Sequence, residues 1–328
     1  MALITAEGLT KIYRQNLKQP GLRGALKSLV KTEWTEKRAV DAVSFSMEEG
    51  ESLACIGENG AGKSTLIKML VGILTPTGGR LTVYGQNPME HHADYLRKIG
   101  VVFGQKTSLW WDIPVIESYE AVKVLYKLDP ALYEKNKRMV VELLDLEPIL
   151  QSPARRLSLG QRMKADIGLV FLHSPRILYL DEPTIGLDIN VKFAIRQFIR
   201  KMNQENGVSV VLTSHDLDDI EQICEHALVL SKGRVFYHGA LDALKENYAT
   251  VRRLTVRGRR LSDIRQFAPE ASLGEEPHKT VIQFDTAQYS ARQMLDFAAR
   301  CYEIEDVTVE DPGIDYVVSK IFTMGAAK

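Results

Sequence analysis

The sequence predicts an α/β protein that carries a smaller α+β domain at its C-terminus. Over the first 240 of its 328 residues, short apolar runs alternate with helical stretches, a pattern typical of a sheet flanked by helices. Near Gly239 the pattern changes, and the strand and helix signals of a second unit follow. We therefore expect an α/β domain over 1–240 and a small α+β domain over 241–328, close to the minimum size for independent folding.

The elements of the first domain follow one another in a regular order. "ESLACIG" (51–57) predicts a strand, and "KSTLIKMLVGIL" (63–74) has helical spacing. "RILYLDEP" (176–183) is a continuous apolar run, as expected for a strand buried on both faces, and "VSVVLTSHD" (208–216) is another. The segment between these two strands predicts an amphipathic helix that stops at Gly207.

Two regions depart from this alternation. Residues 112–150 carry two helix signals with no strand signal between them, which predicts a helical subdomain over about 110–165. In the C-terminal domain, strand signals occur at 250–258, 279–286 and 303–311, and helix signals at 261–268, 290–300 and 313–322. These signals alternate, so they predict a β-α-β-α-β-α order.

Composition excludes several classes of protein. Hydrophobic residues make up 45% of the chain, and 42 Lys plus Arg balance 42 Asp plus Glu, so a general nucleic-acid partner is not expected. No apolar run of about 18 residues occurs, and no signal peptide is apparent. Cys55, Cys224 and Cys301 are widely spaced and form no metal-ligand pairs, which indicates reduced thiols in a cytosolic protein.

A phosphate-binding loop is the strongest functional signal. "GENGAGKST" (57–65) matches G-x-x-x-x-G-K-[ST] between a predicted strand and a predicted helix. Its glycines allow a tight turn whose N–H groups converge on phosphate oxygens, and the helix directs its positive end at the same anion. Lys63 reaches the β- and γ-phosphates, and the Ser64 hydroxyl ligates Mg²⁺. The predicted nucleotide-binding residues are Gly57, Asn59, Gly60, Ala61, Gly62, Lys63, Ser64 and Thr65.

A pair of carboxylates supplies the second half of such a site. Asp181 ends a buried strand and can hold Mg²⁺ through water. Glu182 follows directly, faces differently, and could polarise an attacking water molecule. By itself this pair is equally compatible with a turn at a strand end, but beside a phosphate loop it favours nucleotide hydrolysis.

The stretch "LSLGQ" (157–161) has no catalytic side chain of its own, and by itself it predicts only an N-cap and a turn. Its place in the chain changes that interpretation. The phosphate loop is followed by Gln105 in "VVFGQKTSLWW", the helical stretch, "LSLGQ", "LYLDEP", "GLD" (186–188) and "TSHD" (213–216). Over about 230 residues this order resembles the nucleotide-binding subunits of ABC-type ATPases, which implies their P-loop NTPase fold with a helical subdomain.

The resemblance implies that "LSLGQ" acts across a dimer. Two subunits would face each other head to tail, so that Ser158, Gly160 and Gln161 of one subunit contact the nucleotide held by the other. The Ser158 hydroxyl and the Gly160 N–H would grip the γ-phosphate, and a helix N-terminus does this without a basic side chain. Leu159 departs from the commonest form of the family, where a glycine is usual at this position.

Further roles come from the same resemblance. Tyr13 would stack on adenine, although a core tyrosine is the alternative, and Asp188 would cross the dimer interface. Gln105 would sense Mg²⁺ and the attacking water, and His215 would contact the γ-phosphate. The implied catalytic residues are therefore Glu182, His215, Gln105 and Lys63, and the implied Mg²⁺ ligands are Ser64, Gln105 and Asp181.

These residues imply an ATP- and Mg²⁺-dependent ATPase subunit. We expect it to power export through a permease on a separate chain, as a peripheral protein at the cytoplasmic face of the membrane, paired with an identical or different second ATPase subunit. The C-terminal layout, ending in "EDPGIDYVVSKIF", looks like the tails of ABC-2-type exporter ATPases, including drug-resistance types. An importer ATPase and a non-transport ABC ATPase are the alternatives, and a binding protein with a degenerate site is a further one.

An insert over about 15–38 separates Tyr13 from the first predicted strand of the α/β body. If it forms a helix, its apolar residues fall on one face: Leu22, Ala25, Leu26, Leu29, Val30 and Trp34. Packing on its own domain and docking to a permease or to lipid headgroups are equally compatible with this face. Downstream of Gln105, Trp110 and Trp111 could anchor a cytoplasmic loop of a permease or pack inside the protein.

Overall fold

The fold is described from a computed structural model, which covers residues 2–16, 34–104, 106–248, 251–276, 279–310 and 313–326. The chain divides into two compact units, residues 1–239 and residues 240–328. Each unit encloses its own hydrophobic core. The described residues include no helix with both the length and the apolar character needed to cross a membrane.

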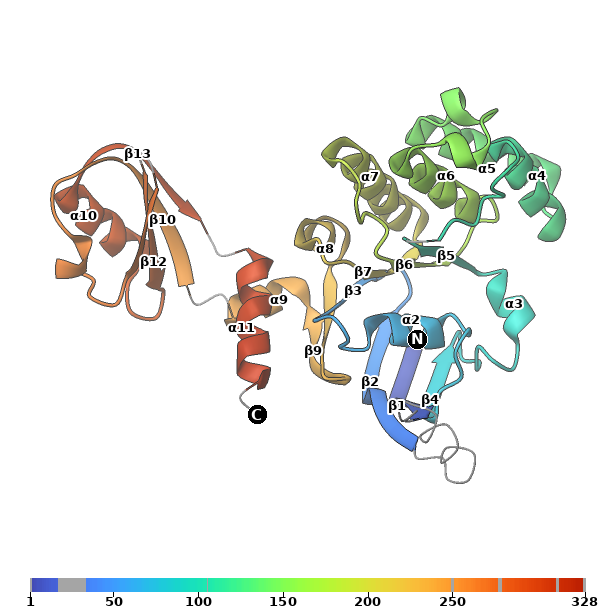
Figure 1. The fold of residues 1–328 in the computed structure, drawn as a ribbon, viewed down its shortest axis with the longest axis horizontal. Helices are drawn as coiled ribbons and strands as arrows, with labels where there is room; N and C mark the ends of the chain where they lie inside the picture. The colour runs from blue at the N-terminus through green and yellow to red at the C-terminus, as the bar shows by residue number, and fades with distance from the viewer. Residues whose placement is uncertain are drawn as a thin grey trace, which may run out of the picture. The chain divides into compact units, whose positions relative to one another are not determined.

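A six-stranded sheet forms the body of the first unit, in the order β5-β6-β7-β3-β8-β9 (Figure 1). Its strands are β3 (Ser52–Gly57), β5 (Ile99–Phe103), β6 (Ile177–Asp181), β7 (Ser209–Thr213), β8 (His226–Ser231) and β9 (Arg234–Ala240). The five strands from β5 to β8 pair in parallel and are almost wholly buried, which explains their continuous apolar runs. Because they are parallel, the carboxyl ends of β3, β6 and β7 meet at one edge of the sheet.

Helices cover both faces of this sheet. On one side lie α7 (Ile189–Asn206) and α8 (Leu217–Ile223), and on the other lie α2 (Lys63–Leu70) and α3 (His92–Leu96) (Figure 1). Helix α7 ends as predicted, because Gly207 adopts φ +66° and its N–H closes the last turn. Helix α2 contacts β3 and β6 on one side and β2 on the other, so it lies between two sheets.

The second sheet of this unit is a three-stranded antiparallel ribbon in the order β2-β1-β4. It consists of β1 (Ala2–Asn16), β2 (Trp34–Glu48) and β4 (Gly78–Val83), which the sequence did not predict. Trp34 begins β2 and is 59% exposed, so its expected place on the apolar face of an insert helix is wrong. Residues 17–33, the rest of that predicted face, lie outside the described residues.

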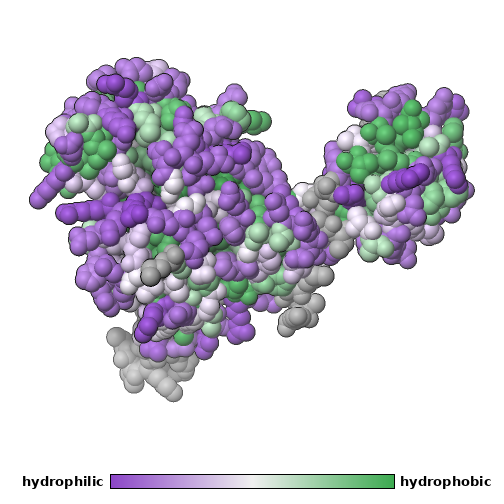
Figure 2. Space-filling view, turned by 180° about the vertical axis from the view of Figure 1, so that it is seen from behind, coloured by the Kyte–Doolittle hydropathy of each residue, from purple (hydrophilic) through white to green (hydrophobic). Residues whose placement is uncertain are grey.

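The helical subdomain consists of α4 (Val115–Leu125), α5 (Pro130–Leu144) and α6 (Leu159–Phe171), with short 3₁₀ turns at Glu147–Ile149 and Ala154–Arg156. Helix α5 begins after Asp129, whose carboxylate accepts from two N–H groups of the first turn, with proline at the first helical position. Helix α4 leaves Val124 and Leu125 exposed. Apolar surface is visible over this helix at the upper left of Figure 2.

The second unit contains α9 (Leu241–Tyr248), β10 (Val251–Arg260), a 3₁₀ turn (Ile264–Gln266), β11 (Ser272–Glu276), β12 (Lys279–Asp285), α10 (Ala291–Cys301), β13 (Tyr302–Glu310) and α11 (Ile314–Ala326). Its strands form one antiparallel sheet in the order β11-β12-β10-β13.

The arrangement of the second unit differs from the sequence-based expectation at two places. The helix expected over 261–268 is only the 3₁₀ turn, because the Asp263 carboxylate bonds the Arg265 N–H in a local turn. Strand β11 has few strand-forming residues and was missed; it is a strand because it pairs with β12.

Candidate active site

The phosphate loop joins the end of β3 to the start of α2. Gly62 caps the helix with φ +104°, and a Cβ atom there would lie 2.3 Å from the Ala39 carbonyl oxygen. Only glycine fits that position without moving the backbone. The buried Lys63 folds back across the loop, and its Nζ donates to the carbonyl oxygens of Gly57 at 2.6 Å and Glu58 at 3.2 Å. The loop thus brings together a lysine ammonium and a helix N-terminus, two groups that attract a phosphate.

A cleft of about 710 Å³ opens over this loop, within the range of small-molecule sites. It is lined by Tyr13, Lys37, Ala39, Asn59, Gly60, Gly62, Lys63, Ser64, Thr65, Glu182, Ile185 and His215. Tyr13 is 36% exposed and lines the cleft, so it is not a core tyrosine. Lys37 and Ala39 were missed, because no motif marks them; antiparallel pairing of β1 with β2 places Lys37 directly opposite Tyr13.

Oxygen ligands for a divalent cation gather where α2 meets the end of β6. The Ser64 hydroxyl donates to Asp181 Oδ1 at 3.1 Å, and the same oxygen accepts from Thr213 Oγ1 at 2.7 Å. A hydroxyl and a carboxylate are the oxygen donors that Mg²⁺ accepts, with phosphate and water completing its shell. Within the described part of the chain, no group of three or more His, Cys, Asp or Glu side chains could hold a metal.

Gln105, predicted to be both a catalytic residue and an Mg²⁺ ligand, lies outside the described residues. Its neighbours are placed beside the cation ligands. Gly104 and Lys106 line a second cavity, of about 380 Å³, together with Ser64, Asp181 and Glu182. This segment is held against β6, because the Gly104 N–H donates to the Asp181 carbonyl at 2.8 Å.

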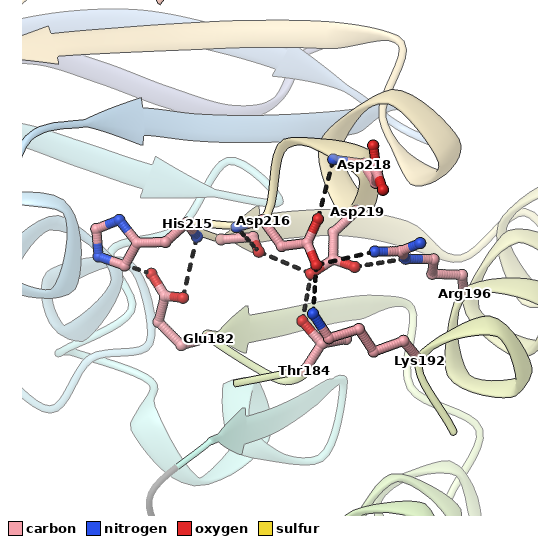
Figure 3. A network of polar contacts seen from close by, with 9 residues as sticks. Glu182, Thr184, Lys192, Arg196, His215, Asp216, Asp218 and Asp219 are labelled. Atoms are coloured by element: carbon pink, nitrogen blue, oxygen red, sulfur yellow. Dashed lines mark hydrogen bonds and ion pairs between the residues drawn. The ribbon is translucent and has the colours of Figure 1, made fainter. Parts of the chain in front are cut away.

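Glu182 and His215 face each other at the edge of the cleft (Figure 3). The His215 N–H donates to Glu182 Oε2 at 3.1 Å, and His215 Nε2 lies 3.4 Å from Glu182 Oε1. Glu182 has φ +57°, a left-handed conformation that costs a non-glycine residue about 1 kcal/mol or more. Its N–H donates to the Thr213 carbonyl at 3.0 Å, so the end of β7 holds this strained residue in place.

Behind this pair lies a polar network that no sequence motif had suggested (Figure 3). Asp219 is fully buried and accepts hydrogen bonds from Thr184 Oγ1, from Ser214 Oγ at 2.7 Å and from Arg196 Nε at 2.5 Å. Asp216 pairs with Lys192 Nζ at 2.5 Å. Burial opposes ionisation of Asp216, but the charges of Lys192 and Arg196 outweigh burial and lower the pKa of this carboxyl.

The residues expected to act across a dimer form a separate cluster. Ser158 and Gln161 make a capping box at the start of α6, in which the Ser158 oxygen accepts from the Gln161 N–H at 3.2 Å. A Cβ atom on Gly160 would lie 2.9 Å from a Val191 methyl, and the Asp188 carboxylate caps α7 by accepting from the Val191 N–H. None of Ser158, Gly160, Gln161 and Asp188 lines the described cleft.

Comparison with known proteins places this geometry in a family. The family model for the ABC transporter matches residues 40–185. The ABC transporter ATP-binding protein NatA of Bacillus subtilis is 31% identical over 210 residues, which cover 64% of this chain and 85% of NatA. The linearmycin resistance ATP-binding protein LnrL of the same organism is 30% identical, covering 70% of this chain and 74% of LnrL.

Other similar proteins agree with this assignment. The methionine import ATP-binding protein MetN of Latilactobacillus sakei is 34% identical over 63% of this chain and 61% of MetN. A solved structure of an ATP-binding subunit of an ABC transporter superposes with a TM-score of 0.63 at 26% identity, covering 75% of this chain and 93% of that one. The predicted α/β fold of the ABC type is therefore confirmed. The chain belongs to the ATP-binding proteins of ABC transporters, and it is an ATPase.

Proposed function

We propose that this chain is the ATPase subunit of an exporter, and that it works as a head-to-tail pair beside a separate membrane permease. The observation that supports the proposal is that the predicted ATP-binding residues lie in two separate places on this chain. Lys63, Glu182 and His215 line one cleft, whereas Ser158 lies at the start of another helix, outside that lining. A second subunit would complete the site by bringing its own Ser158 against the γ-phosphate. ATP binding would close the pair, and hydrolysis would open it.

The proposed chemistry follows from the groups around the cleft. Tyr13 would stack on adenine, and the loop N–H groups with Lys63 would hold the phosphates. Bound Mg²⁺ would neutralise charge on the β- and γ-phosphates, held by Ser64, Asp181 and Gln105. Glu182 would accept a proton from the attacking water, and His215 would hold that carboxylate through its backbone N–H while its ring contacts the γ-phosphate.

A permease partner is supported by the apolar surface of the helical subdomain. Trp110, Val124 and Leu125 are exposed, and Trp110 and Leu125 line a groove of about 230 Å³ between this subdomain and the sheet. A cytoplasmic helix of a permease would bury these side chains, which otherwise remain in water at a cost. Through such a contact, the ATPase would reside at the cytoplasmic face of the membrane.

The sharpest test of the hydrolytic assignment is Glu182→Gln. The amide keeps the shape of the side chain but cannot accept the proton, so we expect turnover to fall by at least about 100-fold. Affinity for ATP should stay within about twofold, because Glu182 is not among the groups that hold the phosphates. Phosphate release and equilibrium binding of ATP measure the two quantities. A variant that retains full turnover would remove Glu182 from the role of base.

Export is favoured by the resistance protein LnrL, and import by MetN, so the direction needs its own experiment. The chain should first be purified from detergent extracts with its membrane partner, and the pair then overproduced in cells challenged with a panel of toxic compounds. If the chain powers export, the wild-type pair should raise the inhibitory concentration of at least one compound. The pair that carries Glu182→Gln should raise the inhibitory concentration of no compound. If instead the wild-type pair increases accumulation of a nutrient inside the cell, the chain belongs to an importer.

A further inference from the structure

A single buried carboxylate links the two loops that carry the proposed hydrolytic pair. We propose that Asp219 is a positioning residue, which sets the geometry of Glu182 and His215 and connects both of them to the first turns of α7. The inference rests on the proposed function of that pair. Asp219 does not reach the cleft, since it is fully buried and is not among the residues that line it.

The first arm of the link runs through two buried hydroxyls (Figure 3). Thr184, two residues after Glu182, donates its hydroxyl proton to Asp219 Oδ2. Ser214, directly before His215, donates to the same oxygen at 2.7 Å. One oxygen atom therefore receives a hydrogen bond from each of the two segments, so a movement of Asp219 would displace the segments of both Glu182 and His215.

The second arm runs to α7 through Arg196. Its Nε donates to Asp219 Oδ1 at 2.5 Å, and its Nη2 lies 3.1 Å from Asp216 Oδ2. Lys192, one helical turn earlier, pairs with the same oxygen of Asp216 at 2.5 Å. Asp188 caps the start of this helix four residues before Lys192. The segment after His215 is thus tied by ion pairs to the half of α7 that begins at Asp188.

The burial and charge of Asp219 favour well-defined positions for the groups that bond to it. A buried carboxylate is tolerated only when it is paired and hydrogen-bonded, and Asp219 meets both conditions through Arg196 and two hydroxyls. Hydrogen bonds to a charged acceptor are shorter than neutral ones and about twice as strong. Misplacing a catalytic group by about 1 Å can lower a rate about 100-fold, so a small loss of this restraint should appear in turnover.

Two substitutions at Thr184 separate positioning from mere stability. Thr184→Val keeps the shape and removes the hydroxyl, whereas Thr184→Ser keeps the hydroxyl and removes a methyl group. We expect the valine variant to lower kcat about 10- to 100-fold with ATP affinity within about twofold, and the serine variant to retain most of the turnover. A residue that only stabilises the fold would give the opposite order or no difference in kcat, because serine leaves a cavity.

Thr280→Val is the matched control for loss of a buried threonine hydroxyl. Thr280 lies on β12 in the second unit, so its substitution should leave kcat unchanged. Thermal unfolding of every variant establishes that the fold is retained. Ser214→Ala removes the other hydroxyl that donates to Asp219 Oδ2, so it should also lower kcat. This variant tests the proposal even if the threonine variants fail to fold.

Combining Thr184→Val with Ser214→Ala gives the decisive outcome. Both hydroxyls act through one oxygen of Asp219, so the double variant should lose little more turnover than the worse single variant. Independent, additive losses would overturn a common restraint, and unchanged kcat in both single variants would overturn the proposal altogether. Glu182→Gln in parallel keeps the two proposals apart: if it abolishes turnover while these variants do not affect it, only the role of Asp219 fails.

Discussion

At the scale of single residues, the site depends on backbone conformations that few residue types adopt. Gly62 has φ +104° at the start of α2, and Glu182 has φ +57° at the end of β6. The glycine is required by contact as well as by conformation, because the Ala39 carbonyl occupies the place of its Cβ. The glutamate accepts strain of about 1 kcal/mol or more so that its carboxylate faces the cleft.

The first prediction compares Gly62→Ala with Gly50→Ala. Both glycines have positive φ, +104° and +83°, but a Cβ on Gly50 meets nothing within 4 Å. Alanine at position 50 should therefore cost only the strain of the left-handed conformation, about 1–2 kcal/mol, with ATP binding intact. Alanine at position 62 should add a steric clash and lower ATP affinity by more than about tenfold. Thermal unfolding and ATP titration measure both effects; equal ATP affinities for the two variants would contradict the prediction.

At the scale of elements, two helices begin with the same capping box. Ser158 and Gln161 start α6, and Ser290 and Gln293 start α10 in the second unit. In α6 the serine oxygen accepts from a backbone N–H, so its own O–H remains available to donate to an anion. The cap and the proposed phosphate contact are therefore compatible, and they can be separated by experiment.

The second prediction uses this pair of helices. Ser158→Ala and Ser290→Ala should each lower stability by about 1 kcal/mol, because each removes one N-cap hydrogen bond. Only Ser158→Ala should also lower ATP turnover, since only that hydroxyl is proposed to grip a γ-phosphate. Chemical denaturation and phosphate release provide the two readouts. If both variants lose turnover equally, or neither does, Ser158 has only the role of a cap.

The third prediction concerns His173 beside α4. Its Nε2 lies 2.9 Å from the Ile99 carbonyl, its ring stacks on Tyr126, and burial lowers its pKa although the carbonyl contact opposes this. The folded protein therefore holds it neutral where the unfolded chain, with a pKa near 6.5, binds a proton. Stability from this residue is complete above about pH 7 and is lost as the pH falls through 6.5, by at most about 1.4 kcal/mol per pH unit.

The matched variant for that prediction is His173→Gln, which can still donate to the Ile99 carbonyl but does not titrate. Urea unfolding between pH 5 and pH 8 should show a shallower loss of stability at low pH for the glutamine variant than for the wild type. Parallel pH profiles for the two proteins would show that this histidine is not neutralised by the fold.

At the scale of the whole molecule, the two units have separate hydrophobic cores. The cleft and the cation ligands belong to residues 1–239, whereas the second unit has a core of its own formed mainly by β10, β12 and α10. We propose that the units are independent domains, and that the second unit contributes to subunit contact or regulation. No residue of the second unit lines the cleft that the structure describes.

The fourth prediction follows from this separation. Calorimetry of the Glu182→Gln protein with both units present should resolve two unfolding transitions, and ATP with Mg²⁺ should raise the midpoint temperature of only one of them. At a free ATP concentration of about 100 times Kd, the stabilisation of that transition should be about 2.7 kcal/mol. A single transition would show that the units unfold as one domain, and an equal shift of two transitions would show that ATP binding stabilises both units.

Local features of the site could be predicted because their physics is local. The glycine spacing of the phosphate loop, the stop at Gly207 and the N-cap at Ser158 each depend on a few consecutive residues, and the structure contains all three. The buried strands could be predicted from the sequence because parallel strands covered on both faces have continuous apolar sequences. The prediction of a helix over 261–268 was wrong, because a local hydrogen bond from the Arg265 N–H to the Asp263 carboxylate favours a turn over a weak helical pattern.

The sequence by itself determined the α/β class, the phosphate loop and the carboxylate pair, since each is encoded by residue types at fixed short spacings. Only the tertiary structure decided that Lys37 and Ala39 line the cleft beside Tyr13, and that Asp219 joins the loops of Glu182 and His215. These relations depend on which strands lie side by side. Strand order is set by packing between segments far apart in the chain, and no local pattern of residues records it.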